Sequence, residues 1–217
     1  MRNILIGIFL ILIAIPALAD GEQPIEALQK GVEAGFRILK DPEFSDVERK
    51  EAQQQKLRII LEQLFDFRIF SKKVLASNWK NFSPSQRKEF VRVFAEFLGK
   101  FYMGKLQKKY KDEKLIYVGQ EMKSATRARV SIKVVWKGQK IPVDLRMIKR
   151  RGLWKVYDIQ VLGVSAVRNY RAQFKSLLSK ETPAQVIDRM KERIRELDSK
   201  KHTGSALENI KRLTSPI

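Results

Sequence analysis

Between about residue 116 and residue 161 the chain alternates apolar and polar side chains with a period of two. Val130, Ile132 and Val134 alternate with charged or polar neighbours, and short turns at Gly138 and Gly152 separate successive runs of this kind. Side chains of a β-strand point alternately to opposite faces, so this period predicts strands with one apolar face. Turns this short join antiparallel neighbours. The segment is therefore expected to be an antiparallel meander with an apolar inner face and a basic outer face.

Helical periodicity lies on both sides of this meander. Apolar residues recur every three to four positions up to about residue 110, and the same spacing returns from about residue 165 to residue 197. Ser45 with Glu48 forms an S-x-x-E capping box, and Ser83 with Gln86 forms a second box of this type. Asp66 is placed to cap a short helix between them. The helix after Ser83 carries one broad aromatic stripe, formed by Phe90, Phe94, Phe97 and Phe101.

The first 19 residues have the features of a cleavable secretory signal peptide. Arg2 precedes the apolar run ILIGIFLILIAI, and Ala17-Leu18-Ala19 supplies an A-x-A cleavage site before Asp20. The apolar run is about a dozen residues long, whereas a helix that spans a bilayer needs roughly 20, so cleavage is favoured over anchoring. We therefore expect export to a bacterial periplasm.

The order of the patterns predicts one α+β domain, because helices precede the meander and further helices follow it. We place this single domain at residues 20–200, after the signal peptide 1–19. The helical pattern fades after Lys201, so residues 201–217 are expected to form a flexible tail.

Composition excludes several classes of active site. The chain has no cysteine, and its one histidine is His202. Disulfides, a thiol nucleophile, a histidine-based triad and a multi-histidine metal site are therefore excluded, and we expect no cofactor and no catalysis. The formal net charge is +20, from 44 Lys and Arg against 24 Asp and Glu. This charge attracts anions such as lipid headgroups, nucleic acid or acidic protein surfaces.

Two long segments carry a resemblance to a known family. Residues 65–102 read FDFRIFSKKVLASNWKNFSPSQRKEFVRVFAEFLGKFY, and residues 143–174 read VDLRMIKRRGLWKVYDIQVLGVSAVRNYRAQF. Within the second, the run W-K-V-x-D-x-x-x-x-G-V-S from Trp154 to Ser165 is the most specific part. Both segments resemble the MlaC or toluene-tolerance family of periplasmic phospholipid-binding proteins, in the same order. The resemblance extends from about residue 23 to residue 197 and includes no catalytic motif.

The resemblance implies a fold and a role. The implied fold is a helical bundle packed on a curved antiparallel sheet, with an apolar cavity between them that holds acyl chains. The implied role is a monomeric phospholipid carrier, the soluble component of an ABC-type lipid transport system. Its implied partners, contacted transiently, are an outer-membrane lipoprotein–porin complex and an inner-membrane ABC transporter with a ring of substrate-binding domains.

A lipid carrier must keep hydrocarbon out of water. Exposure costs about 0.8 kcal/mol per CH₂, so two chains of about sixteen carbons lose on the order of 25 kcal/mol if left in solvent. The candidate pocket wall comprises the aromatic stripe, inward-facing strand residues and the following helix: Phe90, Phe94, Phe97, Phe101, Val134, Leu145, Trp154, Tyr170 and Phe174. The alternative for each of these residues is packed core, the more common role of an apolar stripe.

The strand-to-helix junction after Gly163 supplies the candidate rim of the pocket. Gly163 permits a sharp turn, and the hydroxyl of Ser165 is placed to cap the next helix. Asn169 and Arg171 are expected beside Ser165 at the pocket mouth, where a helix N-terminus favours a lipid phosphate. Alternatively, these polar groups serve to fix the turn. Asp158 is expected to be a structural partner of an arginine or a backbone donor.

Two other functions stay open. An exported polyanion- or nucleic-acid-binding module would use the positive charge, although the aromatic residues fall on faces predicted to be buried. Export also separates the chain from cytoplasmic nucleic acid, so we expect no nucleic acid among its partners. An enzyme would have to use Asp158 with Tyr157 or Tyr170, without help from histidine or cysteine.

Overall fold

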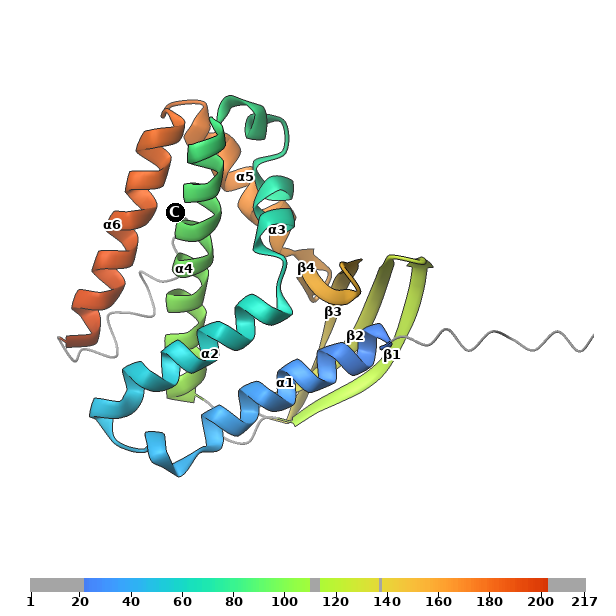
Figure 1. The fold of residues 1–217 in the computed structure, drawn as a ribbon. Helices are drawn as coiled ribbons and strands as arrows, with labels where there is room; N and C mark the ends of the chain where they lie inside the picture. Colours follow the sequence, from blue (N-terminus) through green and yellow to red (C-terminus); the bar gives the residue numbers. More distant parts are fainter. Residues whose placement is uncertain (1–21, 110–113, 137, 203–217) are drawn as a thin grey trace, which may run out of the picture.

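The computed structural model describes residues 22–109, 114–136 and 138–202. These residues form helices and one antiparallel sheet, and Figure 1 shows the helical bundle beside the sheet. The predicted α+β fold class is confirmed. The predicted signal peptide lies outside the described residues, as does the predicted tail apart from its first two residues, which belong to the last helix.

The bounds of the elements are as follows. The α-helices are α1 (Pro24–Lys40), α2 (Lys50–Leu64), α3 (Phe67–Leu75), α4 (Pro84–Lys109), α5 (Ala166–Leu178) and α6 (Pro183–His202). The 3₁₀ helices are η1 (Pro42–Phe44), η2 (Val47–Arg49) and η3 (Ala76–Asn81). The strands are β1 (Lys114–Ser124), β2 (Arg127–Trp136), β3 (Gln139–Arg150), β4 (Leu153–Val161) and β5 (Val164–Ser165), and they lie in the sheet in this same order.

Local sequence signals account for most of the helix starts. The Asp66 carboxylate accepts a hydrogen bond from the backbone N–H of Ile69 at 2.8 Å and so caps α3. At the start of α4, the backbone N–H of Ser83 donates to the Gln86 side chain at 2.9 Å, and the Gln86 backbone donates to the Ser83 hydroxyl at 3.2 Å. Both predictions are confirmed.

The predicted capping box of Ser45 and Glu48 is wrong. Asp41 caps η1 instead, by accepting a hydrogen bond from the backbone N–H of Glu43 at 2.9 Å. The chain then turns through η1 and η2, which buries the side chain of Phe44, and α2 begins only at Lys50. The tight turn that buries Phe44 takes the place of the predicted first helical turn.

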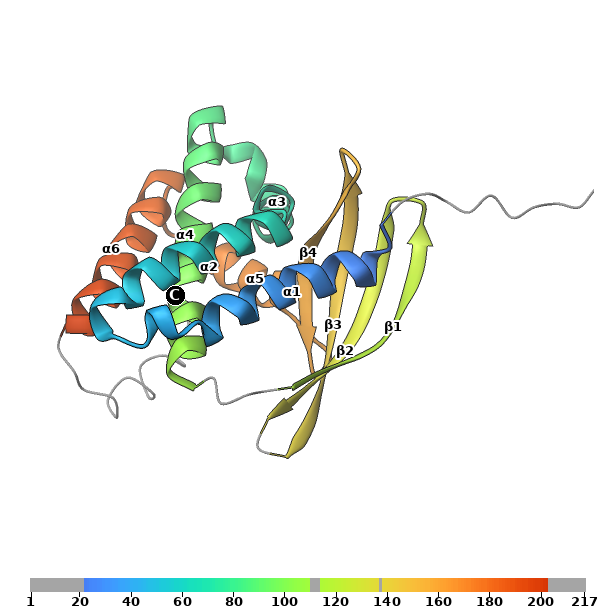
Figure 2. The ribbon, with the colours of Figure 1, turned by 60° about the horizontal axis from the view of Figure 1, so that its bottom comes forward.

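The sheet curves around α1, which lies across its concave face, and α2 leads from α1 back toward the bundle of α3 to α6 (Figure 2). Register shifts interrupt the ladder between Tyr117 and Gly119 in β1 and opposite Arg146 and Met147 in β4. Such bulges increase the local twist and bend the strand. They therefore help the sheet to wrap around the helix.

The bulge in β4 is at Tyr157 and changes which side chains face inward. Val156 pairs with Met147 before it, and Asp158 pairs with Arg146 after it. The extra residue places Asp158 on the opposite face from Val156, although the two lie two positions apart. Asp158 therefore faces the start of α5 rather than the apolar concave face.

Buried apolar residues form two clusters that share no residue in the described part of the chain. The helical core comprises Phe70, Val74, Leu75, Phe82, Phe90, Val93, Phe94, Phe97, Leu98, Val167, Tyr170, Phe174, Val186, Ile187, Met190 and Ile194. The sheet core comprises Leu28, Ala128, Val130, Ile132, Val143, Leu145, Met147, Trp154 and Val156. The first holds α3 to α6 together, and the second holds α1 on the concave face of the sheet.

Candidate functional site

The structure divides the predicted wall residues between the two cores. The aromatic residues of α4 and α5 lie in the helical core or pack against it: Phe90, Phe94, Phe97, Phe101, Tyr170 and Phe174. The strand residues lie in or against the sheet core: Val134, Leu145 and Trp154. Residues that were expected to line one cavity thus lie on two sides of the molecule.

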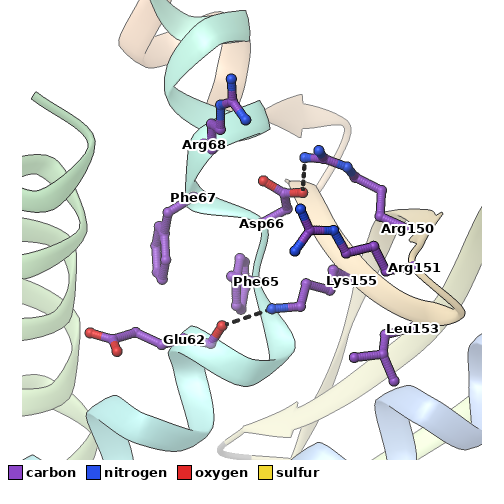
Figure 3. A pocket seen from close by; sticks show the side chains of 9 residues that line it. All are labelled: Glu62, Phe65, Asp66, Phe67, Arg68, Arg150, Arg151, Leu153 and Lys155. Atoms are coloured by element: carbon purple, nitrogen blue, oxygen red, sulfur yellow. Dashed lines mark hydrogen bonds and ion pairs between the residues drawn. The ribbon is translucent and has the colours of Figure 1, made fainter. Parts of the chain in front are cut away.

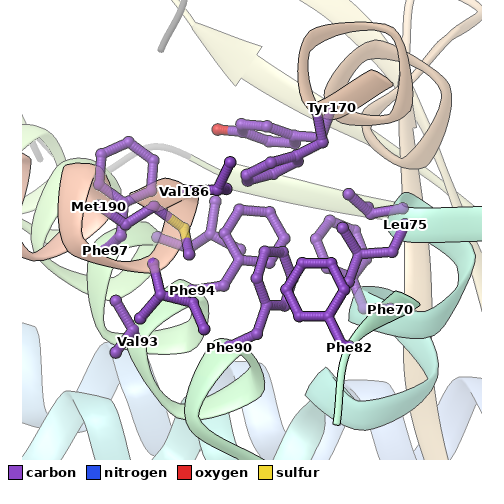
Figure 4. Packing of buried hydrophobic residues seen from close by; sticks show 14 of the residues in the cluster. Phe70, Leu75, Phe82, Phe90, Val93, Phe94, Phe97, Tyr170, Val186 and Met190 are labelled. Carbon is purple, nitrogen blue, oxygen red and sulfur yellow. The ribbon is translucent and has the colours of Figure 1, made fainter. Parts of the chain in front are cut away.

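The aromatic stripe forms a tight group inside the bundle. The ring of Phe174 lies 5.1 Å from that of Phe90 and 5.2 Å from that of Phe94, measured between ring centroids, and Tyr170 lies 5.2 Å from Phe94. Figure 4 shows the rings of Phe90, Phe94 and Tyr170 packed among neighbouring apolar side chains. Phe90, Phe94 and Phe174 have 0% of their surface exposed. This arrangement stabilises the bundle through aromatic edge contacts, and contact of these rings with lipid stays a prediction.

The hydroxyl of Tyr170 lies at the edge of this cluster of aromatic rings. It lies 3.3 Å from the hydroxyl of Tyr102, a residue of α4 that is about half exposed. Burial raises the pKa of the Tyr170 phenol well above its ordinary value, and the neighbouring Tyr102 adds to the effect. Tyr170 therefore stays neutral in the folded protein at physiological pH.

The two cores meet at an aromatic pair that we call the seam, Phe65 and Phe67. Phe65, just after α2, packs against the sheet core, and Phe67, the first residue of α3, packs against the helical core. Their rings stack with centroids 5.6 Å apart and planes inclined by 21°. Both side chains are half-buried. The seam is therefore the place where apolar surfaces of both cores come together and stay accessible.

A pocket of about 470 Å³ opens at the seam, as Figure 3 shows. Its lining comes from the α2–α3 connection and from the turn between β3 and β4: Glu62, Phe65, Asp66, Phe67, Arg68, Arg150, Arg151, Leu153 and Lys155. The floor is apolar, and the edge is mostly cationic. Such a pocket combines an apolar surface for hydrocarbon with positive charge for an anion.

Asp66 joins the two sides of this pocket. Its backbone N–H donates to the carbonyl of Val156 at 2.8 Å, and one carboxylate oxygen caps α3. The other carboxylate oxygen lies 3.0 Å from a guanidinium nitrogen of Arg150 on the β3 side. Asp66 is buried, so this ion pair fixes the position of the pocket edge more firmly than an exposed pair would.

The rim residues predicted at the junction have other partners. The Ser165 hydroxyl accepts the backbone N–H of Arg168 at 3.1 Å, which confirms its predicted role as helix cap. Arg171 donates two hydrogen bonds to the backbone carbonyl of Lys73, at 3.0 and 2.8 Å, and so clamps the last turn of α3. Asn169 is exposed and accepts a hydrogen bond from Gln173. These three residues do not line the pocket at the seam.

Asp158 has the structural role that the sequence predicted. Its carboxylate accepts hydrogen bonds from the Ser165 hydroxyl at 2.8 Å and from the backbone N–H of Val167 at 3.0 Å. A guanidinium nitrogen of Arg146 lies 3.6 Å away. With these partners the carboxylate orients the start of α5.

Sequence reasoning missed the pocket at the seam. Its signals were present but separate: the basic run Lys149-Arg150-Arg151 at a turn, and two phenylalanines flanking Asp66 at a helix start. Only the fold brings these segments together, because Asp66 and Arg150 are 84 positions apart.

Comparison with known proteins decides the family. The family model described as "MlaC protein" matches residues 29–192. The chain belongs to the MlaC family. No curated protein matches this MlaC-family chain.

A solved structure supports the fold of this family member. It is similar, with a TM-score of 0.70 and 21% sequence identity, to a phospholipid-binding protein from Ralstonia solanacearum whose structure holds a phospholipid. The match covers 82% of this chain and 99% of that protein. The bundle and sheet described above are thus an arrangement already seen in an experimental structure.

Residues 22–109, 114–136 and 138–202 show neither a metal site nor a membrane-spanning helix. No group of three or more histidine, cysteine, aspartate or glutamate side chains there is arranged to hold a metal ion. No helix in these ranges has the length and apolar character required to cross a membrane.

Proposed function

We propose that this chain is a periplasmic phospholipid carrier that is exported by a cleavable signal peptide. It shelters acyl chains between the helical core and the sheet core and leaves the headgroup near the surface. It acts as the soluble component of an ABC-type lipid transport system and is not an enzyme. Membership of the MlaC family supports this proposal.

The observation that carries the proposal is the separation of the two apolar cores, which meet at the seam. A solid α+β domain would join its helices and sheet in one continuous core. Here half-buried apolar side chains remain on the border of each core, among them Phe67 and Phe101 on the helical side and Leu64, Val134 and Ile159 on the sheet side. Such borders offer apolar surface that an acyl chain would cover.

The free energy of burial favours this use. Each CH₂ moved from water to an apolar surface contributes about 0.8 kcal/mol, so even one acyl chain outweighs the cost of parting a few side-chain contacts. The R. solanacearum protein of similar fold binds a phospholipid, which supports the same ligand class here.

The transport partners that we propose are membrane-bound. Lipid would pass between an outer-membrane lipoprotein–porin complex and an inner-membrane ABC transporter with a ring of substrate-binding domains. The exported chain lacks Arg2, so its formal charge is 43 minus 24, or +19, and this charge would favour transient contact with acidic faces of these partners.

The proposal is tested by extracting the purified protein with organic solvent and measuring phospholipid by mass spectrometry. Val134→Trp places a large ring on the concave side of β2 and should reduce co-purified phospholipid several-fold. Val135→Trp is the matched control, because the neighbouring residue points to the other face of the sheet. Wild type and control should carry phospholipid. A well-folded wild type that carries none and accepts none from labelled vesicles would contradict the proposal.

A further inference from the structure

The pocket at the seam has a positive edge, and some of its basic side chains have no partner among the residues that the structure describes. Four basic residues and two acidic residues line it. One acidic residue, Asp66, is engaged by the cap of α3 and by Arg150. The Lys155 amine donates to the backbone carbonyl of Glu62 at 3.2 Å. Arg68 and Arg151 are exposed, and neither makes an ion pair or hydrogen bond through its side chain in the described part of the chain.

The backbone of Arg151 adds a second observation. Arg151 and Gly152 form the two-residue turn between β3 and β4, with φ angles of 49° and 81°. Turns with two positive φ angles favour Asn-Gly, since a residue with a long side chain is strained in this region. An arginine here adds nothing to the turn, and its guanidinium reaches over the pocket toward the seam, as Figure 3 shows. The turn thereby places an exposed guanidinium group at the edge of the pocket.

The chemistry of the edge matches one kind of group. Arginine guanidinium groups bind phosphate oxygens through two parallel N–H donors, and two of them with a lysine can surround a phosphate. The floor beneath is the seam, where Phe65 and Phe67 join the borders of the two cores. A molecule with its phosphate on this edge would therefore have its hydrocarbon at the entrance to the apolar borders.

We propose that this pocket binds the phosphate of the lipid headgroup through Arg68 and Arg151, with Lys155 beside them, and prefers headgroups of net negative charge to zwitterionic ones. This inference rests on the proposed carrier function and adds selectivity to it. The preference follows from the excess of cations, because a zwitterionic headgroup brings its own ammonium group into a site that is already positive.

The test is a competition between two lipids with identical acyl chains. Protein is loaded from vesicles that contain equal amounts of phosphatidylglycerol and phosphatidylcholine, and the bound lipids are extracted and counted by mass spectrometry. The double variant Arg68→Gln, Arg151→Asn removes the two free guanidinium groups, and asparagine suits the positive φ of the turn. The matched control, Arg92→Gln with Arg195→Gln, removes the same charge from α4 and α6.

Wild type and control should carry more phosphatidylglycerol than phosphatidylcholine. In the double variant this preference should fall about tenfold, because two positive charges no longer oppose the choline ammonium group. Total phospholipid per folded protein should stay the same in all three. The headgroup site would be overturned if the double variant kept the wild-type preference, or if wild type showed no preference. The proposed carrier function would still stand in both cases. Wild type without any lipid would overturn the carrier itself.

A final arm separates lipid from free phosphate. Inorganic phosphate is titrated into lipid-free wild type and double variant by calorimetry at constant ionic strength. We expect weak binding to wild type at most, since the site also needs hydrocarbon on its floor. Saturable binding that the double variant loses, with no headgroup preference in the vesicle experiment, would assign the pocket to free phosphate and overturn the proposal.

Discussion

The hydroxyl of Ser165 donates a hydrogen bond to the buried carboxylate of Asp158 at 2.8 Å and at the same time accepts the backbone N–H of Arg168. This one side chain joins the end of the sheet to the start of the bundle. The bulge at Tyr157 turns Asp158 toward it, and Gly163, with a φ of 79°, allows the chain to fold back. The polar residues in this apolar stretch therefore serve to hold the two layers in one orientation.

Ser165→Ala should lower the free energy of unfolding by about 2 kcal/mol, because it removes a helix cap and one of the donors to a buried carboxylate. Urea denaturation measures this loss. Ser176→Ala, on an exposed position of the same helix, is the control and should change stability by less than about 0.5 kcal/mol. Equal effects of the two substitutions would show that Ser165 does not hold the junction.

The sequence predicted the features that depend on neighbouring residues. The capping pair of Ser83 and Gln86 and the cap at Asp66 were read correctly because each involves residues three apart. The turns at Gly138 and Gly152 also predicted the strand order correctly, because each short turn joins strands that are consecutive in the sequence. Alternation cannot reveal the bulge at Tyr157, because the inserted residue shifts the pattern only once a partner strand defines the register.

The candidate site was less accessible to sequence reasoning. The aromatic stripe predicted a buried face, but nothing in its spacing distinguishes a core from a pocket wall, and the structure packs Phe90, Phe94 and Phe174 against one another. The pocket at the seam depends on contacts between distant segments. Arg150 reaches Asp66 only because β3 lies near the start of α3.

Phe94→Ala tests the role of the stripe as core. Its ring contacts several other aromatic rings and has 0% of its surface exposed, so truncation should lower the free energy of unfolding by about 3–5 kcal/mol. Phe101→Ala, at the half-buried end of the same stripe, should cost clearly less. Denaturant titration of both variants compares them. A similar loss at both positions would contradict the assignment of Phe94 to a closely packed interior.

The raised pKa of the Tyr170 phenol predicts that the stability of the protein depends on pH in the alkaline range. This pKa is raised in the folded state by burial, whereas in the unfolded chain it returns to about 10. The stabilisation that the neutral phenol contributes is therefore complete below about pH 10 and is lost as the pH rises above it. Tyr170→Phe removes this effect.

Unfolding titrations at about pH 8 and about pH 10.5 measure the difference in stability between wild type and Tyr170→Phe. The difference should move in favour of the phenylalanine variant at the higher pH, because phenylalanine has no proton to lose. A difference that is the same at both pH values would mean that Tyr170 ionises as easily in the folded protein as in the unfolded chain.

The most direct measurement of the carrier proposal is an isotope-filtered NOE spectrum of the lipid-loaded protein with labelled isoleucine, leucine and valine methyl groups. Cross-peaks with acyl-chain protons should appear at the borders of the cores, on Leu64, Val134 and Ile159. They should be absent from Val186 and Ile187, which lie inside the helical core. Acyl-chain contacts confined to Val186 and Ile187, with none at the borders, would contradict the proposal that lipid lies between the two cores.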